Sequence, residues 1–84
     1  MEYVKLNGQF PKLGRSAVTL GKFDGIHRGH RKLIRTILER KKEYGELAVV
    51  MAFISDRQTI LTSEERQTYL EKMGVDVLLE CPLN

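Results

Sequence analysis

The order of hydrophobic and polar positions along the chain predicts alternating strands and helices. A short apolar run at 17–20 ends at Gly21 and predicts a strand. Residues 48–53 are continuously apolar, as is typical of a strand covered on both faces in a parallel sheet. The last strand is expected at 75–79, with Pro82 closing it because proline has no N–H to donate to a ladder.

Two helices are expected between these strands. The first is predicted from about His30 to Tyr44, with Gly45 as its C-terminal cap. Its apolar positions recur at helical spacing, at Leu33, Ile34, Ile37 and Leu38. The second opens with a capping box formed by Thr62 and Glu65 and ends at Gly74.

This order of elements predicts an α/β fold. Strands joined by helices make right-handed crossovers, which gives a three-layer sandwich around a parallel sheet. A short additional strand is a candidate at 3–6. The 84 residues allow a single domain, 1–84, whole or partial, because domains usually have about 100–150 residues. The small core and the exposed edges of a three-stranded sheet predict self-association, and we expect a homodimer.

Charge and cysteine content narrow the class of protein. The formal net charge is +3, and half of the 14 basic residues lie within 28–42. A solvated helix face explains them; a nucleic-acid interface is the weaker alternative, because no aromatic platform accompanies them. Cys81 has no internal disulfide partner, which fits a reducing compartment. No apolar signal core opens the chain and no run approaches the roughly 20 apolar residues of a membrane span, so we expect a cytoplasmic protein without a membrane partner.

The segment 21–30 carries the candidate chemistry. It follows the first regular strand and opens the first helix, where free backbone N–H groups and the positive end of the helix attract an anion such as phosphate. Its glycines allow the backbone to approach a ligand closely. His27 and His30 are three residues apart, so on a first helical turn both can donate to phosphate oxygens.

Other uses of the same residues are weaker. A zinc site is poorly supplied, because the chain has no third histidine and its one cysteine, Cys81, is distant. A serine or cysteine nucleophile is not placed at a strand-to-helix elbow with a base nearby. Asp24 could be a base, a magnesium ligand or a residue that braces the loop, and bracing is the commonest use of an aspartate among glycines.

The run Gly-Lys-Phe-Asp-Gly-Ile-His-Arg-Gly-His at 21–30 resembles the signature of the nucleotidyltransferase superfamily with the histidine-x-glycine-histidine motif. It is most similar to bacterial FAD synthetases, the FMN adenylyltransferase module of bifunctional riboflavin kinase/FMN adenylyltransferase. Gly25, directly after Phe-Asp, favours this flavin branch. The segments 61–79 and 82–83 are similar to the second helix and third strand of the family.

The resemblance implies a Rossmann-like nucleotidyltransferase fold, in a truncated or miniature version, and adenylyl transfer from ATP to FMN. FAD and pyrophosphate would be the products, and Mg²⁺ would accompany ATP. By the same resemblance His27 and His30 would hydrogen-bond the triphosphate, and no residue is assigned as a metal ligand. The nucleotide loop would be shaped by Gly21, Phe23, Asp24 and Gly29.

The chain also departs from the family pattern. Lys22 stands where the family usually has asparagine, and 54–57 (Ile-Ser-Asp-Arg) replaces a Pro-His-Pro stretch on the flavin side. The connection 53–61 is shorter than usual, and the segment that supplies further phosphate contacts in the family does not follow the third strand. Two hypotheses remain: an adenylyltransferase that is truncated or completed by a partner chain, and a non-catalytic nucleotide-binding or interaction module of the same fold.

Overall fold

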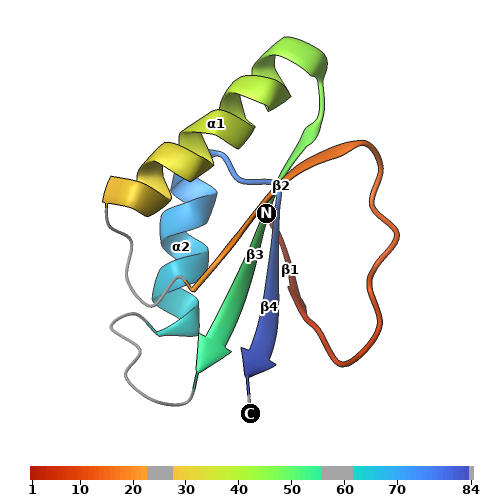
Figure 1. Cartoon of the computed structure of the whole chain (residues 1–84), viewed down its shortest axis with the longest axis vertical. Coiled ribbons are helices and arrows are strands. Elements are labelled where there is room, and N and C mark those ends of the chain that lie inside the picture. Colours follow the sequence, from red (N-terminus) through yellow and green to blue (C-terminus); the bar gives the residue numbers. More distant parts are fainter. Residues whose placement is uncertain (23–27, 56–61, 84) are drawn as a thin grey trace.

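The computed structural model describes residues 1–22, 28–55 and 62–83 of the chain, and in these ranges the side chains of 28, 29, 55 and 83 are left aside (Figure 1). The described part contains four strands and two helices in the order β1 (Glu2–Lys5), β2 (Ser16–Gly21), α1 (Arg28–Tyr44), β3 (Leu47–Ser55), α2 (Ser63–Met73) and β4 (Val77–Leu83). The strands form one parallel sheet in the order β1-β4-β3-β2.

Both helices lie on the same face of this sheet (Figure 1). The chain steps across the sheet in one direction from β2 to β3 to β4, and successive right-handed crossovers in one direction place their helices on one face. The β1–β2 connection, with Leu13, packs on the opposite face. The α/β class and the parallel sheet are confirmed. Among the described residues, the β1–β2 connection forms the layer on the face opposite the helices.

The continuous apolar run in β3 is explained by burial on both faces. Ala48, Val50 and Ala52 face α1 and α2 and pack around Ile34 and Leu70. The alternate residue Val49 belongs to a second core cluster on the other face, with Leu6, Val77 and Leu79. The prediction of a central strand at 48–53 is confirmed, and β3 is longer by one residue before and two after.

The ends of the helices follow the local signals in the sequence. Thr62 Oγ1 accepts a hydrogen bond from Glu65 N at 3.1 Å, and Glu65 Oε1 accepts one from Thr62 N at 3.0 Å, so the capping box is confirmed. Gly74 ends α2 with φ +103°, and Gly45 follows α1 with φ +69°. Glycine occupies this left-handed region without the steric cost that other residues meet.

The sheet departs from the expectation at both ends of the chain. The candidate strand at 3–6 is present as β1 and pairs with β4, so the sheet has four strands rather than three. The last strand was expected at 75–79 with Pro82 as its stop, and this was wrong, because β4 spans Val77–Leu83 and includes Pro82. Leu6 N donates to Glu80 O, so Glu80 turns its backbone toward β1. Two residues on, the missing N–H of Pro82 points to the same side, beyond the end of β1, where it breaks no ladder bond.

Charged residues next to the amino ends of β3 and β4 fix the C-terminal half of α1. Arg40 Nε donates to the buried carboxylate of Glu46 at 2.7 Å, and this hydrogen bond lowers the pKa of Glu46. Lys41 Nζ lies 2.9 Å from Asp76 Oδ1, and Ala48 N donates to Asp76 Oδ2 at 2.8 Å. Burial alone would raise the pKa of Asp76, but these two partners hold it below its ordinary value. The helix is thereby fastened at its C-terminal end, which sets where its N-terminus lies.

Candidate functional site

The carboxyl edge of the sheet is stepped. Gly21, the last residue of β2, pairs with Ala52, whereas β3 runs three residues further, to Ser55. At about 3.3 Å per residue, β3 therefore extends about 10 Å beyond the level at which β2 ends. Ligands of open parallel α/β sheets bind outside the carboxyl ends of the strands, so this step is the expected location of a site.

The first turn of α1 belongs to this edge. α1 begins at Arg28 and packs against β2 and β3, so Gly29 and His30 lie in its first turn, and Gly21 closes β2. The side chain of His30 is half-buried. Three of the predicted site residues lie outside the described residues: Phe23, Asp24 and His27. That His27 and His30 lie on the same side of a helical turn therefore stays a prediction.

The charges at the start of α1 favour an anionic ligand. The first turn of α1 has no acidic residue, whereas the first turn of α2 holds Glu64 and Glu65. Acidic side chains normally stabilise the positive end of a helix, as they do in α2. In α1 the sequence instead places Arg28, His30 and Arg31 near that end. A phosphate group would supply the negative charge that the helix itself lacks there.

A second polar cluster lies at the end of β4, and the sequence analysis missed it. Arg66 NH1 donates to Glu80 Oε2 at 2.6 Å, and the two residues are only 1% and 5% exposed. Glu80 Oε1 also accepts from Tyr3 Oη at 2.6 Å and from Ser63 Oγ at 2.9 Å. Burial, and then the hydrogen bond to Glu80, raise the pKa of Tyr3. We call these four residues the Glu80 cluster.

The sequence contained one signal for this cluster. Glu80 stands inside the apolar run that forms β4, and a carboxylate in a strand covered on both faces needs a partner. Pairing in the sheet places Glu80 between Lys5 of β1 and Ala52 of β3, and α2 brings Arg66 over it. The partner could not be identified from the sequence alone, because it depends on the register of three parallel strands.

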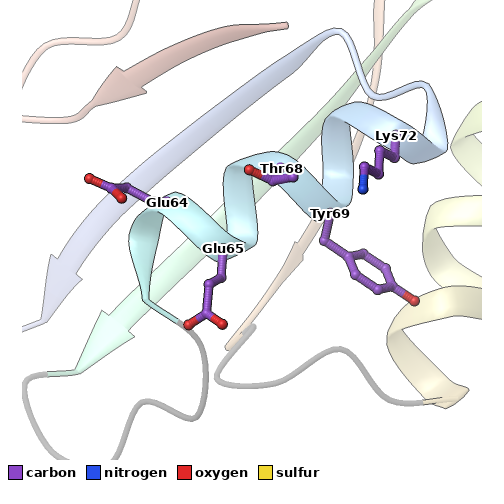
Figure 2. Close-up of a pocket in the computed structure, with 5 residues that line it drawn as sticks. All are labelled: Glu64, Glu65, Thr68, Tyr69 and Lys72. Carbon is purple, nitrogen blue, oxygen red and sulfur yellow. The ribbon is translucent and has the colours of Figure 1, made fainter.

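Two hollows lie near these residues. One, of about 210 Å³, opens at the carboxyl edge beside the Glu80 cluster and is lined by Tyr3, Lys5, Ile54, Ser63, Glu80 and Pro82. The other, of about 430 Å³, is a shallow depression on the outer side of α2, and its lining residues are drawn in Figure 2: Glu64, Glu65, Thr68, Tyr69 and Lys72. Two carboxylates and one ammonium group make the second a poor receptor for a triphosphate.

Neither a membrane helix nor a metal cluster is found in the part of the chain that the structure describes. None of its helices is long and apolar enough to cross a bilayer. Among residues 1–22, 28–55 and 62–83, no group of three or more His, Cys, Asp or Glu side chains is placed to hold a metal ion.

Comparison with known proteins gives a consistent family. Residues 10–84 match the sequence profile of the FAD synthetases. The chain is 31% identical over 81 residues to the bifunctional riboflavin kinase/FMN adenylyltransferase of Escherichia coli K12, covering 84% of this chain and 26% of that protein. It is 33% identical to the FAD synthetase of Listeria monocytogenes over 81 residues, 82% of this chain and 32% of the relative. The Bacillus subtilis bifunctional enzyme is 30% identical over 83% of this chain and 26% of its own length. The chain thus spans about a quarter to a third of these relatives.

Proposed function

Since the chain belongs to the FAD synthetase family, we propose that it is an FMN adenylyltransferase-type module that transfers AMP from ATP to FMN. The observation that carries the proposal is the glycine- and histidine-containing segment between β2 and α1, whose helix begins at the carboxyl edge without an acidic residue in its first turn. Such a start provides backbone donors and positive potential for phosphate groups.

In this proposal the phosphate of FMN attacks the α-phosphorus of ATP. A new P–O bond forms there as the bond to the bridging oxygen of pyrophosphate breaks, so the products are FAD and pyrophosphate, and no covalent enzyme intermediate is required. The protein contributes positioning and charge stabilisation. Mg²⁺ would accompany the ATP phosphates.

The proposed roles of the residues follow the family motif. His27 and His30 would donate hydrogen bonds to the triphosphate and stabilise the charge that develops on it during transfer. Gly21 and Gly29 would let the backbone approach the nucleotide, and Phe23 and Asp24 would shape the loop between them. The position of Gly21 at the end of β2 and of Gly29 in the first turn of α1 supports these assignments.

A second candidate is a non-catalytic nucleotide-binding or interaction module. The observation that favours it is the sequence 54–57, which lacks the Pro-His-Pro stretch expected on the flavin side. A helix N-terminus with a glycine-containing loop can bind phosphate groups without any chemistry following. This candidate predicts ATP binding without release of pyrophosphate.

The test measures ATP binding by calorimetry and pyrophosphate release with ATP, Mg²⁺ and FMN. His27→Ala and His30→Ala are each expected to lower the rate about 10²- to 10³-fold, as removal of a donor to transition-state charge does. Lys32→Ala is the matched control, because Lys32 is an exposed cation on the same helix. Equal rates in all variants would refute the enzyme, and ATP binding with no turnover in the wild type would favour the second candidate.

Self-association and a cytoplasmic location are further parts of the proposal. Val18 and Leu20 on β2 are 50% and 55% exposed, and among the described residues no strand pairs with the outer edge of β2. A second copy could cover this edge, in which case Leu20→Lys would lower the sedimentation coefficient of the chain. The half-buried, unpaired Cys81 supports a reducing compartment.

A further inference from the structure

The outer edge of β2 presents backbone groups for pairing. Leu47 N donates to Arg15 O at 2.9 Å, so the backbone of Arg15 points toward β3. This direction alternates along a strand, which turns the N–H and C=O groups of three residues toward the outer edge: Ser16, Val18 and Leu20. Among the described residues, no strand pairs with them. An edge of this kind is a template for another strand.

Exposed apolar side chains border this edge on the face opposite the helices. Ala17 packs in the core under α1, and side chains alternate along a strand, so Val18 and Leu20 point to the other face. They are 50% and 55% exposed, whereas Val49 and Met51, their neighbours on β3, pack in the core of that face. The β1–β2 connection thus leaves β2 partly uncovered.

One flank of α1 borders the same edge on the helix side. Arg40 on this flank reaches Glu46, which also lies 3.5 Å from Arg15 at the start of β2. Successive helical residues are about 100° apart, so Leu33 and Tyr44 lie within about 40° of Arg40 around the helix axis. They are 46% and 51% exposed. Four of the six large apolar side chains that are exposed among the described residues therefore adjoin the outer edge of β2.

A second copy of the chain matches this edge through two-fold symmetry. In an antiparallel ladder, two residues that face each other exchange both of their hydrogen bonds. A ladder centred on Val18 joins Ser16 to Leu20 of the second copy, so all three outward-pointing residues of each β2 are paired. A two-fold axis at Val18, perpendicular to the sheet, generates this register and keeps the helices of both copies on one face.

The two copies of α1 then meet at a normal packing distance. α1 contacts both β2 and β3, so it lies about half a strand spacing inside β2, and the axis lies half a spacing outside. With strands about 4.8 Å apart, the two helices are about 10 Å apart, as packed helices are. The four half-exposed side chains offer roughly 100 Å² each, about half of the 800 Å² per partner in a standard interface. The strand backbone and the rest of the α1 flank add to this area.

From this symmetry we propose that β2 pairs with β2 of a second copy, and that Arg15 of each copy lies beside Gly21 and the first turn of α1 in the other. In the register centred on Val18, Arg15 stands opposite Gly21 of the second copy, with Cα atoms about 4.5 Å apart. Its side chain points to the helix side, as it does toward Glu46, and α1 begins on that side. The inference rests on the proposed function, because ATP is the ligand that Arg15 would contact there.

The charges link this dimer to an anion. The first turn of α1 has no acidic residue, and His30 and Arg31 lie near it, so a further cation is repelled until phosphate groups bind. The side chain of Arg15 is 78% exposed, and Glu46 keeps its 2.7 Å hydrogen bond from Arg40, so Arg15 can leave Glu46 at little cost. ATP that binds better to the dimer should therefore tighten it.

Sedimentation velocity of the complete chain, with and without ATP and Mg²⁺, tests the interface. Val18→Pro removes an outward N–H that makes no bond to β3, and Leu33→Glu puts a charge in the α1 contact, so both variants should be monomeric. Phe10→Glu is the matched control and should stay dimeric, because Phe10 is 65% exposed and borders Leu6 and Cys81. Leu33→Glu keeps the test valid if Val18→Pro does not fold.

Mixed variants test whether Arg15 acts on the other copy. Arg15→Ala and His30→Ala are each expected to weaken ATP binding about tenfold, the effect of one lost charged hydrogen bond. In an equal mixture about half of the dimers hold one copy of each variant, and one of their two sites has both residues. About a quarter of all sites should therefore regain wild-type affinity in calorimetry. Lys12→Ala, the matched control at an exposed cation, should bind ATP normally.

Each outcome decides the inference. A wild type that is monomeric with ATP, or dimers of both Val18→Pro and Leu33→Glu, would overturn the interface. A mixture that binds ATP no better than its two components would overturn the role of Arg15. Dimers that depend on Val18 and Leu33 but release no pyrophosphate would retain the interface and refute the proposed function. Pyrophosphate release by a monomer would retain the function and overturn the inference.

Discussion

Replacing Glu80 with glutamine is expected to destabilise the chain strongly. The substitution removes the carboxylate that pairs with Arg66, which is buried at 1% exposure, although the amide oxygen can still accept from Tyr3 or Ser63. Breaking a buried ion pair from one side typically costs about 3–5 kcal/mol. A chain of 84 residues has a free energy of unfolding of about 4–13 kcal/mol, at roughly 0.05–0.15 kcal/mol per residue. Glu80→Gln should therefore remove about a quarter or more of the stability.

Urea denaturation followed by circular dichroism measures this loss. With a denaturant slope of about 1.5 kcal/mol per molar, the midpoint should fall by about 2–3 M. Glu39→Gln is the matched control, because Glu39 is exposed on α1, and its effect should stay within about 0.5 kcal/mol. The double variant Arg66→Met/Glu80→Val removes both charges and should recover most of the stability. A loss below about 1 kcal/mol in Glu80→Gln, or a double variant no more stable than the single one, would refute the reasoning.

Three further predictions concern backbone strain and pH. Gly74→Ala should lower the free energy of unfolding by about 1 kcal/mol, because φ is +103° there, whereas Gly14→Ala, with open space around it and no positive φ, should be neutral in the same urea experiment. Asp76→Asn should make stability less dependent on pH in the acid range. The pKa of Asp76 is lowered in the folded state, so its contribution to the free energy of unfolding is complete above the ordinary value of 3.8 and is lost as the pH falls through the folded pKa. An unchanged pH dependence in the variant would contradict this. The pKa of Tyr3 is raised above 10.0, so its contribution to the free energy of unfolding is complete below that pH and is lost as the pH rises through the folded pKa. In an absorbance titration, the tyrosine that ionises at the highest pH should disappear in Tyr3→Phe and persist in Tyr44→Phe.

Much of the fold could be predicted from the sequence because its signals are local. The capping box at Thr62, the glycines after both helices and the apolar run in β3 each act within a few residues, and each is confirmed. The extent of β4 could not be predicted in this way. Whether Pro82 ends a strand depends on which neighbour its missing N–H would face, and that is set by β1, which is some 77 residues away in the sequence.

The candidate site shows the same difference between local signals and contacts between distant elements. The segment 21–30 could be proposed as a phosphate site because its glycines and histidines are close together in the sequence. The structure places Gly21 at the end of β2 and Gly29 and His30 in the first turn of α1, and phosphate binding there stays a prediction. The Glu80 cluster escaped prediction because it joins β1, β4 and α2, three elements that only the strand order brings together.

The cost of the Glu80 cluster is itself an argument about its purpose. Buried ion pairs are seldom more stabilising than well-packed apolar residues of the same volume, so stability alone gives little reason to place Arg66 and Glu80 at the end of β4. Their geometric effect is to hold the hydroxyl groups of Tyr3 and Ser63, which both donate to Glu80 Oε1. If the double variant Arg66→Met/Glu80→Val is at least as stable as the wild type, stability does not explain the ion pair, and its effect is to orient Tyr3 and Ser63. If the double variant is less stable than the wild type, the two charges serve the packing of α2 against β4.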